Sequence, residues 1–207
     1  MNVIAFLSQK GGSGKTTLSV HTAVAAEATG ERVCVIDADP QESATAWASA
    51  REAGTPIVAT AQAPELDAAL RAAEAEGMTL AIIDSPPHAA PAAGQIARRS
   101  QLVLIPVRPA AFDLKAVPAA VEIVRAAKVR GAFVLSACPF RAPEIEEARA
   151  ALETYGLPIA PQEITQRRPF ERAVTSGSAV TEFETEGKAA EEIRALWVWI
   201  KETLERK

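Results

Sequence analysis

Several features of exported, membrane-bound and metal-cluster proteins are missing from this 207-residue sequence. It has only two cysteines, Cys34 and Cys138, and each lies in an apolar run and not at the spacing of metal ligands. We therefore predict buried free thiols. No apolar run approaches the ~18 residues that a membrane span needs. A secretory signal has a basic segment before its apolar stretch, and the first apolar stretch of this sequence has none. These absences predict a cytoplasmic protein.

An excess of positive charge is missing too. The chain has 22 lysines and arginines against 26 acids, which gives a formal net charge of −4. This balance excludes a surface coated in basic residues, but binding to nucleic acid needs only a local basic patch. Overall charge therefore leaves nucleic-acid binding open. Because the sequence has no repeat and no low-complexity linker, we expect residues 1–207 to form a single domain.

The pattern that is present is an alternation of two kinds of segment. Short runs rich in Val, Ile and Leu alternate with alanine-rich stretches whose charges recur at helical spacing. This alternation predicts an α/β fold in three layers, with a mostly parallel, twisted sheet of about seven strands flanked by helices. The expected strands are 3–7, 33–37, 57–60, 80–84, 102–107, 132–137 and 157–160. The expected helices are 15–29, 64–76, 113–128, 143–155 and 188–205.

A glycine-rich segment, SQKGGSGKTT at residues 8–17, joins the first expected strand to the first expected helix. Its glycines let the backbone curl around a phosphate chain, and the following helix presents its positive end. In such a P-loop Lys15 reaches the β- and γ-phosphates, Thr16 supplies a hydroxyl to Mg²⁺ and Thr17 donates to the α-phosphate. The expected nucleotide contacts in the loop are Lys10, Gly11, Gly12, Ser13, Gly14, Lys15, Thr16 and Thr17.

Three carboxylates stand where expected strands end. Asp37 and Asp39 close the strand 33–37, and Asp84 closes the strand 80–84. Ligands of open α/β sheets bind at this end of the strands, so at least one of Asp37 and Asp39 should reach the metal or the attacking water. Asp84 suits a Mg²⁺ contact through water, whereas Asp39 could also serve as a simple cap. After Asp84 we expect a γ-phosphate-sensing switch in which His88 faces solvent.

The loop departs from the ordinary Walker pattern, because Gln9 replaces the first glycine and a second lysine, Lys10, follows it. In this respect the sequence resembles the deviant Walker A family, which includes the ParA partition ATPases, MinD and the nitrogenase iron protein. The resemblance implies ATP and Mg²⁺ as cofactors. It implies that Lys10 reaches across a nucleotide-sandwich homodimer and stabilises the partner's transferring phosphate. It also implies that Asp37 lies near Mg²⁺ and that Asp39 orients or activates water. Lys10, Lys15 and Asp39 are thus the expected catalytic residues, with Thr16, Asp37 and Asp84 around the metal.

The resemblance extends along most of the chain. Residues 104–109 look like the proline-rich segment that flanks adenine in small ParA proteins, which would place Pro106 beside the nucleotide. Residues 164–170 look like the C-terminal signature of these proteins, which would bring Arg167 to the nucleotide as well. The length matches the short plasmid-partition type represented by ParF, which lacks an N-terminal helix-turn-helix, so autonomous operator binding is not expected.

The family's behaviour supplies the functional expectation. Its partition members dimerise around ATP, bind DNA without sequence preference, and hydrolyse ATP slowly until a partner that marks the cargo stimulates them. The resemblance therefore implies a nucleoid-associated homodimeric ATPase for plasmid or chromosome partition or for cargo positioning. A ParB- or ParG-like centromere-binding or adaptor protein is the implied partner. The candidate DNA contacts are Arg167, Arg168 and Arg172, which lie close together in the chain.

Two alternatives stay open. A MinD-like protein would end in a membrane-targeting helix, and the tail does carry an apolar stripe. Four glutamates in the same region would weaken its attraction to anionic lipid, so we expect the stripe to pack in the core and expect no membrane contact. The stripe is Ile193, Leu196, Trp197, Ile200 and Leu204. The other alternative is a nucleotide-controlled protein-binding switch, but the presence of Lys10, Lys15 and Asp39 favours an active ATPase.

Overall fold

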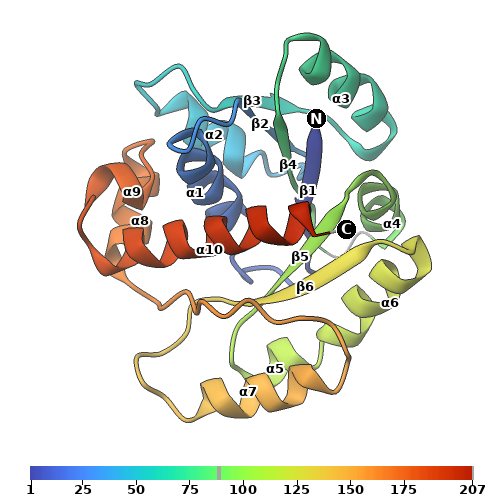
Figure 1. The fold of residues 1–207 in the computed structure, drawn as a ribbon, viewed down its shortest axis with the longest axis vertical. Coiled ribbons are helices and arrows are strands. Elements are labelled where there is room, and N and C mark those ends of the chain that lie inside the picture. The colour runs from blue at the N-terminus through green and yellow to red at the C-terminus, as the bar shows by residue number, and fades with distance from the viewer. Residues whose placement is uncertain (88–89, 207) are drawn as a thin grey trace.

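The computed structural model describes residues 1–87 and 90–206, so His88 lies outside the described residues. Its centre is a six-stranded sheet in the order β3-β2-β4-β1-β5-β6, with every pair of neighbours parallel. The strands are β1 Asn2–Phe6, β2 Val33–Asp37, β3 Ile57–Thr60, β4 Leu80–Asp84, β5 Leu102–Val107 and β6 Arg130–Leu135. Helices lie on both faces of the sheet (Figure 1), which confirms the predicted three-layer α/β architecture.

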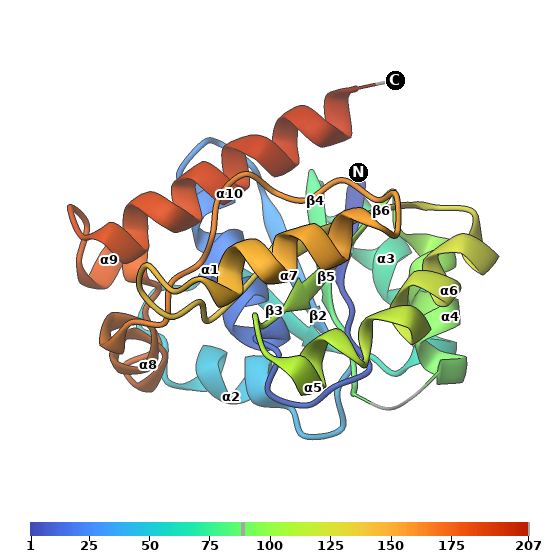
Figure 2. The ribbon, with the colours of Figure 1, turned by 90° about the horizontal axis from the view of Figure 1, so that it is seen from below.

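The helices divide between the two faces. Those on one face, α1, α2, α8, α9 and α10, share a single core with the sheet, and α3, α4, α6 and α7 pack on the opposite face (Figure 2). In chain order the helices are α1 Lys15–Glu27, α2 Ser43–Ser49, α3 Leu66–Ala75, α4 Ala90–Arg99, α5 Ala111–Leu114, α6 Val117–Ala127, α7 Glu144–Glu153, α8 Arg168–Thr175, α9 Val180–Phe183 and α10 Lys188–Glu205. A short 3₁₀ turn, η1 Ala63–Glu65, precedes α3.

The central strands are apolar throughout because both of their faces are covered. In β1, Ile4 and Phe6 enter the core under α1 and α10, while Val3 and Ala5 enter the core under α3 and α4. The same alternation continues in the neighbouring strands. With all these strands buried, their carboxyl ends form one edge at which polar side chains collect.

Besides shifts of one or two residues at the ends of other elements, such as β6, two expected elements differ in the structure. The strand expected over 157–160 is reduced to one bridge between Phe133 and Ile159, so the sheet has six strands and not seven. The helix expected over 113–128 is divided into α5 and α6, and Pro118 falls in the first turn of α6. Proline lacks the N–H of a helix interior but fits a first turn, so a new helix begins at this point.

The C-terminal helix α10 buries its apolar stripe against α1, as predicted. Ile193, Leu196, Trp197 and Ile200 are at most 2% exposed. The indole Nε1 of Trp197 also donates a hydrogen bond to the Thr29 hydroxyl at 2.9 Å. Among the described residues, no helix is both long enough and apolar enough to cross a membrane.

Both cysteines are free and buried, as predicted. Burial raises the pKa of the Cys34 thiol to about 11 and that of Cys138 to about 12. Thiols with pKa values this high are uncharged at neutral pH and behave as small apolar side chains.

Candidate functional site

The glycine-rich loop curls between β1 and α1 at the carboxyl edge of the sheet. Gly12 and Gly14 adopt φ angles of +73° and +96°, a left-handed region that side chains other than glycine rarely enter. No side chain caps the first turn of α1. Its free N–H groups and the positive end of the helix dipole therefore suit an anion. The hydroxyl of Ser136 donates to the carbonyl of Ser13 at 2.8 Å and anchors the loop to the segment after β6.

Lys15 begins α1 and is only 6% exposed. Burial lowers the pKa of its ammonium group, and the nearby carboxylates of Asp84 and Asp39 oppose that change. Lys15 lies in a cavity of about 270 Å³ that brings the loop and one of the predicted acids together. The cavity is lined by Gly11, Gly12, Gly14, Lys15, Thr16, Thr17, Asp39, Gln41, Ser43 and Pro87.

Asp37 and Asp84 are neighbours in the sheet, at the ends of β2 and β4, and both are fully buried. The oxygens of Asp37 are occupied. Its Oδ2 accepts from the backbone N–H and hydroxyl of Thr45 at 2.9 and 3.1 Å, and its Oδ1 accepts from the N–H of Asp39 at 3.2 Å. Asp37 therefore holds the first turn of α2 from its position beside Asp84.

Asp84 accepts fewer hydrogen bonds than Asp37. In the described part of the chain, neither of its oxygens has a hydrogen-bond partner in good geometry. Burial raises the pKa of Asp84 to about 7; the Thr16 hydroxyl and the Lys15 ammonium oppose the rise, and the Asp37 carboxylate adds to it. A buried carboxylate with free oxygens beside a threonine hydroxyl fits a Mg²⁺ ion that keeps part of its water shell.

A metal ion at this place would need ligands from outside the protein. Within residues 1–87 and 90–206, no three acids, histidines or cysteines stand close enough to hold a metal ion. Mg²⁺ commonly takes one or two carboxylates and completes its shell with substrate phosphates and water. The donor set of Thr16, Asp37 and Asp84 thus fits Mg²⁺ carried in with a nucleotide.

Asp39 lines the cavity and also holds a turn of the backbone. Its side chain lines the cavity, and its Oδ1 also accepts from the N–H of Gln41 at 2.9 Å. The residue before α2 is Glu42, so Asp39 steadies the turn 39–42 rather than the helix itself. This bond holds the carboxylate at the mouth of the cavity.

The second lysine of the loop, Lys10, lies outside the cavity that Lys15 enters. Its Nζ is hydrogen-bonded and ion-paired to Oδ2 of Asp113, on the short helix α5. Sequence reasoning missed Asp113 as a site residue, because no spacing rule connects two residues that are 103 positions apart. Lys10 is 34% exposed at its side chain, so it remains accessible from solvent.

A second cavity, of about 170 Å³, adjoins the loop on the other side. Gly12, Gly14, Thr17 and Leu18 form one wall. The opposite wall contains Arg108, Ser136, Ala137, Ile164, Thr165, Gln166, Arg167, Phe170 and Glu171. This position suits the nucleoside half of a nucleotide whose phosphates occupy the loop.

Of the two residues expected beside the nucleoside, the structure brings one to this cavity. Arg167 lines it and is fixed by Glu192, whose Oε1 accepts from Nε and Nη2 at 3.2 and 2.8 Å. Pro106 is buried in β5 and lines a small cleft beside Lys10, whereas Arg108, two residues further on, lines the second cavity.

The three arginines suggested for DNA contacts have different surroundings. Arg167 is paired with Glu192, as described above. Arg168 and Arg172 lie on α8 and are exposed. The guanidinium of Arg172 stands 5.4 Å from the centre of the Phe183 ring. Of these three arginines, Arg168 and Arg172 are therefore the two that are exposed and make no ion pair with another described residue.

Comparisons with known proteins agree with this geometry. The family model described as "CobQ/CobB/MinD/ParA nucleotide binding domain" matches residues 4–180. The chain is 34% identical over 212 residues to the maintenance of carboxysome distribution protein A of Gloeobacter kilaueensis, covering 99% of this chain and 94% of the relative.

Solved structures share the fold. A complex of a Cyanothece McdA variant with ATP aligns with a TM-score of 0.75 at 18% identity, over 100% of this chain and 97% of the other. The septum site-determining protein MinD of Pyrococcus horikoshii, complexed with Mg-ADP, aligns with a TM-score of 0.80 at 15% identity, over 99% and 97% of the two chains. From its phosphate loop, its sheet order and these matches, the chain belongs to the CobQ/CobB/MinD/ParA family of nucleotide-binding domains.

Proposed function

We propose that this chain is a Mg²⁺-dependent ATPase that forms a homodimer when it binds ATP, and that it positions a cargo along DNA. One observation carries the proposal: the loop's two lysines are separated. Lys15 shares its cavity with Asp39, whereas Lys10 stands outside that cavity and is held by Asp113. Once it leaves Asp113, a lysine that does not face its own phosphate site can reach the phosphates of a second molecule.

The residues divide the chemistry of hydrolysis among themselves. Lys15 and the N–H groups at the start of α1 hold the phosphate chain. Thr16, Asp37 and Asp84 would hold Mg²⁺ beside the phosphates, where the ion would supply positive charge to the leaving and transferring groups. Asp39 orients the attacking water, and Lys10 of the partner subunit stabilises the charge that develops on the γ-phosphate.

Cargo positioning is supported by the whole-length similarity to the carboxysome distribution protein of Gloeobacter kilaueensis. DNA binding is supported by the two exposed arginines of α8, Arg168 and Arg172. A ParB- or ParG-like adaptor protein that marks the cargo would stimulate hydrolysis, and non-specific DNA would place the protein on the nucleoid. The cargo is a plasmid, a chromosomal locus or another large assembly.

The direct test measures ATP hydrolysis and binding to random-sequence duplex DNA. Binding is measured with ATP, with ADP and without nucleotide, each at two salt concentrations. We expect slow hydrolysis and DNA binding that requires ATP and weakens as salt is raised. Hydrolysis without DNA binding in any state would redirect the proposal to a nucleotide-controlled protein-binding switch, and absence of ATP binding would overturn it altogether.

A further inference from the structure

The acid Asp37 is tied to helix α2 at the helix's first turn. Thr45 is the third residue of α2, and both its N–H and its hydroxyl donate to Oδ2 of Asp37. Whatever moves the start of α2 therefore moves or releases a carboxylate at the metal side of the nucleotide site.

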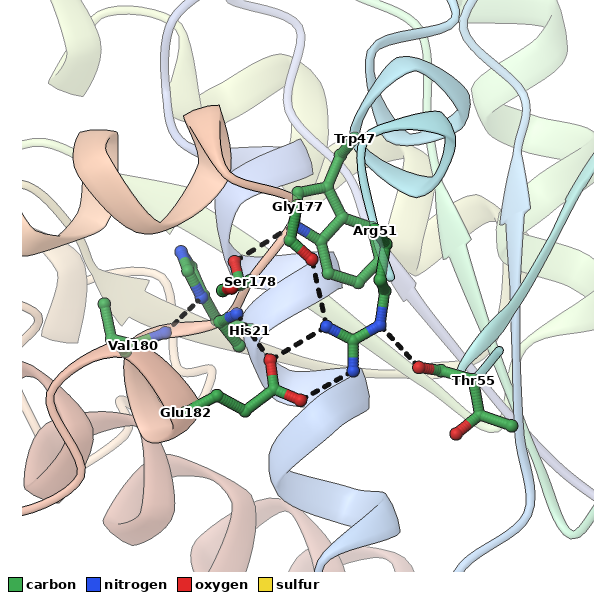
Figure 3. Close-up of polar contacts among 9 residues, drawn as sticks. His21, Trp47, Arg51, Thr55, Gly177, Ser178, Val180 and Glu182 are labelled. Atoms are coloured by element: carbon green, nitrogen blue, oxygen red, sulfur yellow. Dashed lines mark hydrogen bonds and ion pairs between the residues drawn. The ribbon is translucent and has the colours of Figure 1, made fainter. Parts of the chain in front are cut away.

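The other end of α2 is fastened to the C-terminal part of the chain. Trp47 is 2% exposed, and its Nε1 donates to the carbonyl of Ser178 at 3.1 Å. Arg51 follows the helix and makes a two-point contact with Glu182, at 2.8 and 2.6 Å. Figure 3 shows the Arg51 guanidinium between the carboxylate of Glu182 and the backbone carbonyls of Thr55 and Gly177. Its Nη1 donates to the Gly177 carbonyl at 3.0 Å.

The turn that receives these contacts joins α8 to α9 and fits closely against α2. Gly177 has a φ of +66°, and a Cβ there would stand 2.4 Å from the backbone of Ala50. The start of α9 is fixed to α1, because the N–H of Val180 donates to Nδ1 of the fully buried His21 at 3.1 Å. The turn is therefore a rigid base for α2 and also the direct continuation of the basic helix α8.

From these contacts we infer that Arg51 is a positioning residue for the nucleotide site, and that α2 links Asp37 to the turn between α8 and α9. The inference rests on the proposed function, since it concerns the Mg²⁺–ATP site and the helix proposed to face DNA. It adds a specific route by which binding at the nucleotide site changes the binding of DNA at α8, and the reverse.

The physical reason lies in the length of α2, which has only seven residues. A helix this short is not stable by itself in water, so tertiary contacts at its ends decide whether it forms. Asp37 holds its first turn through Thr45, and Trp47 and Arg51 hold its other end. Without the Arg51 contacts the end of α2 frays, and in a helix of about two turns this loosens the first turn and the two hydrogen bonds from Thr45 that orient Asp37. The phosphate loop has no such dependence, because it is held by β1, α1 and Ser136.

The test compares Arg51→Lys with a matched control, Arg99→Lys. Arg99 makes an equivalent two-point contact with Asp67 at another surface of the molecule. Lysine keeps the charge but loses the fork of donors that makes two parallel bonds. ATP affinity is measured by calorimetry for the parent and both variants, once with Mg²⁺ and once with EDTA.

We expect Arg51→Lys to lower the affinity for Mg²⁺–ATP by about tenfold, because the hydrogen bonds from Thr45 that orient the Asp37 carboxylate are lost. Its affinity for ATP in EDTA, and both affinities of Arg99→Lys, should equal those of the parent. Glu182→Gln keeps the length of the side chain but leaves one acceptor for Arg51 in place of two and removes the charge. It should show a loss in the same direction and serves as the second variant if Arg51→Lys fails to fold.

Hydrogen exchange gives a second readout that does not depend on affinity. Mg²⁺–ATP should slow exchange in residues 177–183 of the parent and not in Arg51→Lys. If Mg²⁺ raises the ATP affinity of Arg51→Lys by as much as it raises that of the parent, the inference is wrong while the proposed function stands. If the parent does not bind ATP at all, the proposed function and the inference both fail.

Discussion

Lys10 and Asp113 form an ion pair that joins the phosphate loop to helix α5. The side chain of Asp113 is 6% exposed, and its second oxygen, Oδ1, has no partner among the described residues. Under the proposed mechanism Lys10 must leave this carboxylate before it can reach the phosphate of a second subunit. Under the same mechanism, we expect the pair to stabilise the separate subunit against the proposed dimer.

The first prediction concerns this competition. Asp113→Asn should lower the protein concentration at which ATP produces the dimer by about fivefold, since a partly exposed ion pair contributes about 1 kcal/mol. Sedimentation velocity across a concentration series measures the midpoint. Asp67→Asn removes a surface ion pair far from the loop in the chain and serves as the control. An unchanged midpoint in Asp113→Asn would show that the pair does not compete with dimerisation.

A second prediction concerns the acid at the mouth of the cavity. Asp39→Ala should reduce ATP hydrolysis by about 100-fold or more, as expected when a group that positions the attacking water is lost. ATP affinity should change little, so the ATP-bound dimer should accumulate. Single-turnover hydrolysis measured beside dimer fraction separates these effects, and hydrolysis at the parent rate would refute the assignment of Asp39.

The buried imidazole of His21 predicts how stability depends on pH. Complete burial lowers the pKa of His21 to about 3, against about 6.5 in the unfolded chain. Since the folded pKa is the lower one, the folded state resists protonation. Its stability is complete above pH ~6.5 and falls as the pH drops toward 3.

For this one group, the free energy of unfolding should be about 2 kcal/mol smaller at pH 5 than at pH 7.5. His21→Asn keeps an acceptor for the Val180 N–H and cannot take up the proton, so it should lose this part of the pH dependence. Urea unfolding at both pH values measures the difference. Equal pH dependence in parent and variant would contradict the assignment.

Two glycines with almost the same backbone angle allow a matched comparison of packing. Gly156 and Gly177 have φ angles of +69° and +66°, but a Cβ meets nothing within 4 Å at Gly156 and collides with Ala50 at Gly177. Gly156→Ala should therefore cost about 1 kcal/mol, for the left-handed angle alone. Gly177→Ala should cost about 2 kcal/mol more, because backbone must shift. Similar losses of unfolding free energy would show that the α8–α9 turn is not rigidly fixed against α2.

The sequence predicted the elements whose apolar pattern is continuous. The strands β2, β4 and β5 have the bounds expected from it, because strands covered on both faces are apolar with little interruption. The edge strand β3 and the helix α10 also have the expected bounds. It did not predict α2 or α4. The first has only seven residues and the second contains a proline and a glycine, Pro91 and Gly94, so neither shows a clear helical period.

In the candidate site, too, some features could be predicted from local sequence and others could not. The loop and the acids at strand ends follow from local sequence and from where parallel strands end, so their meeting could be anticipated. The pairs Lys10–Asp113 and Arg51–Glu182 join residues 103 and 131 positions apart. Such contacts depend on how the helices pack on the sheet, and a periodic pattern within one segment cannot predict them.

The central claim is that the two lysines of the loop serve different molecules. Its most direct test measures ATP affinity and molecular mass together, by calorimetry and by light scattering with saturating ATP, for the parent, Lys15→Ala and Lys10→Ala. The account predicts a parent that doubles its mass with ATP, a Lys15→Ala variant that does not bind ATP, and a Lys10→Ala variant that binds ATP nearly as well as the parent but remains a monomer. Equal loss of ATP affinity in the two variants, or a Lys10→Ala variant that dimerises like the parent, would contradict it.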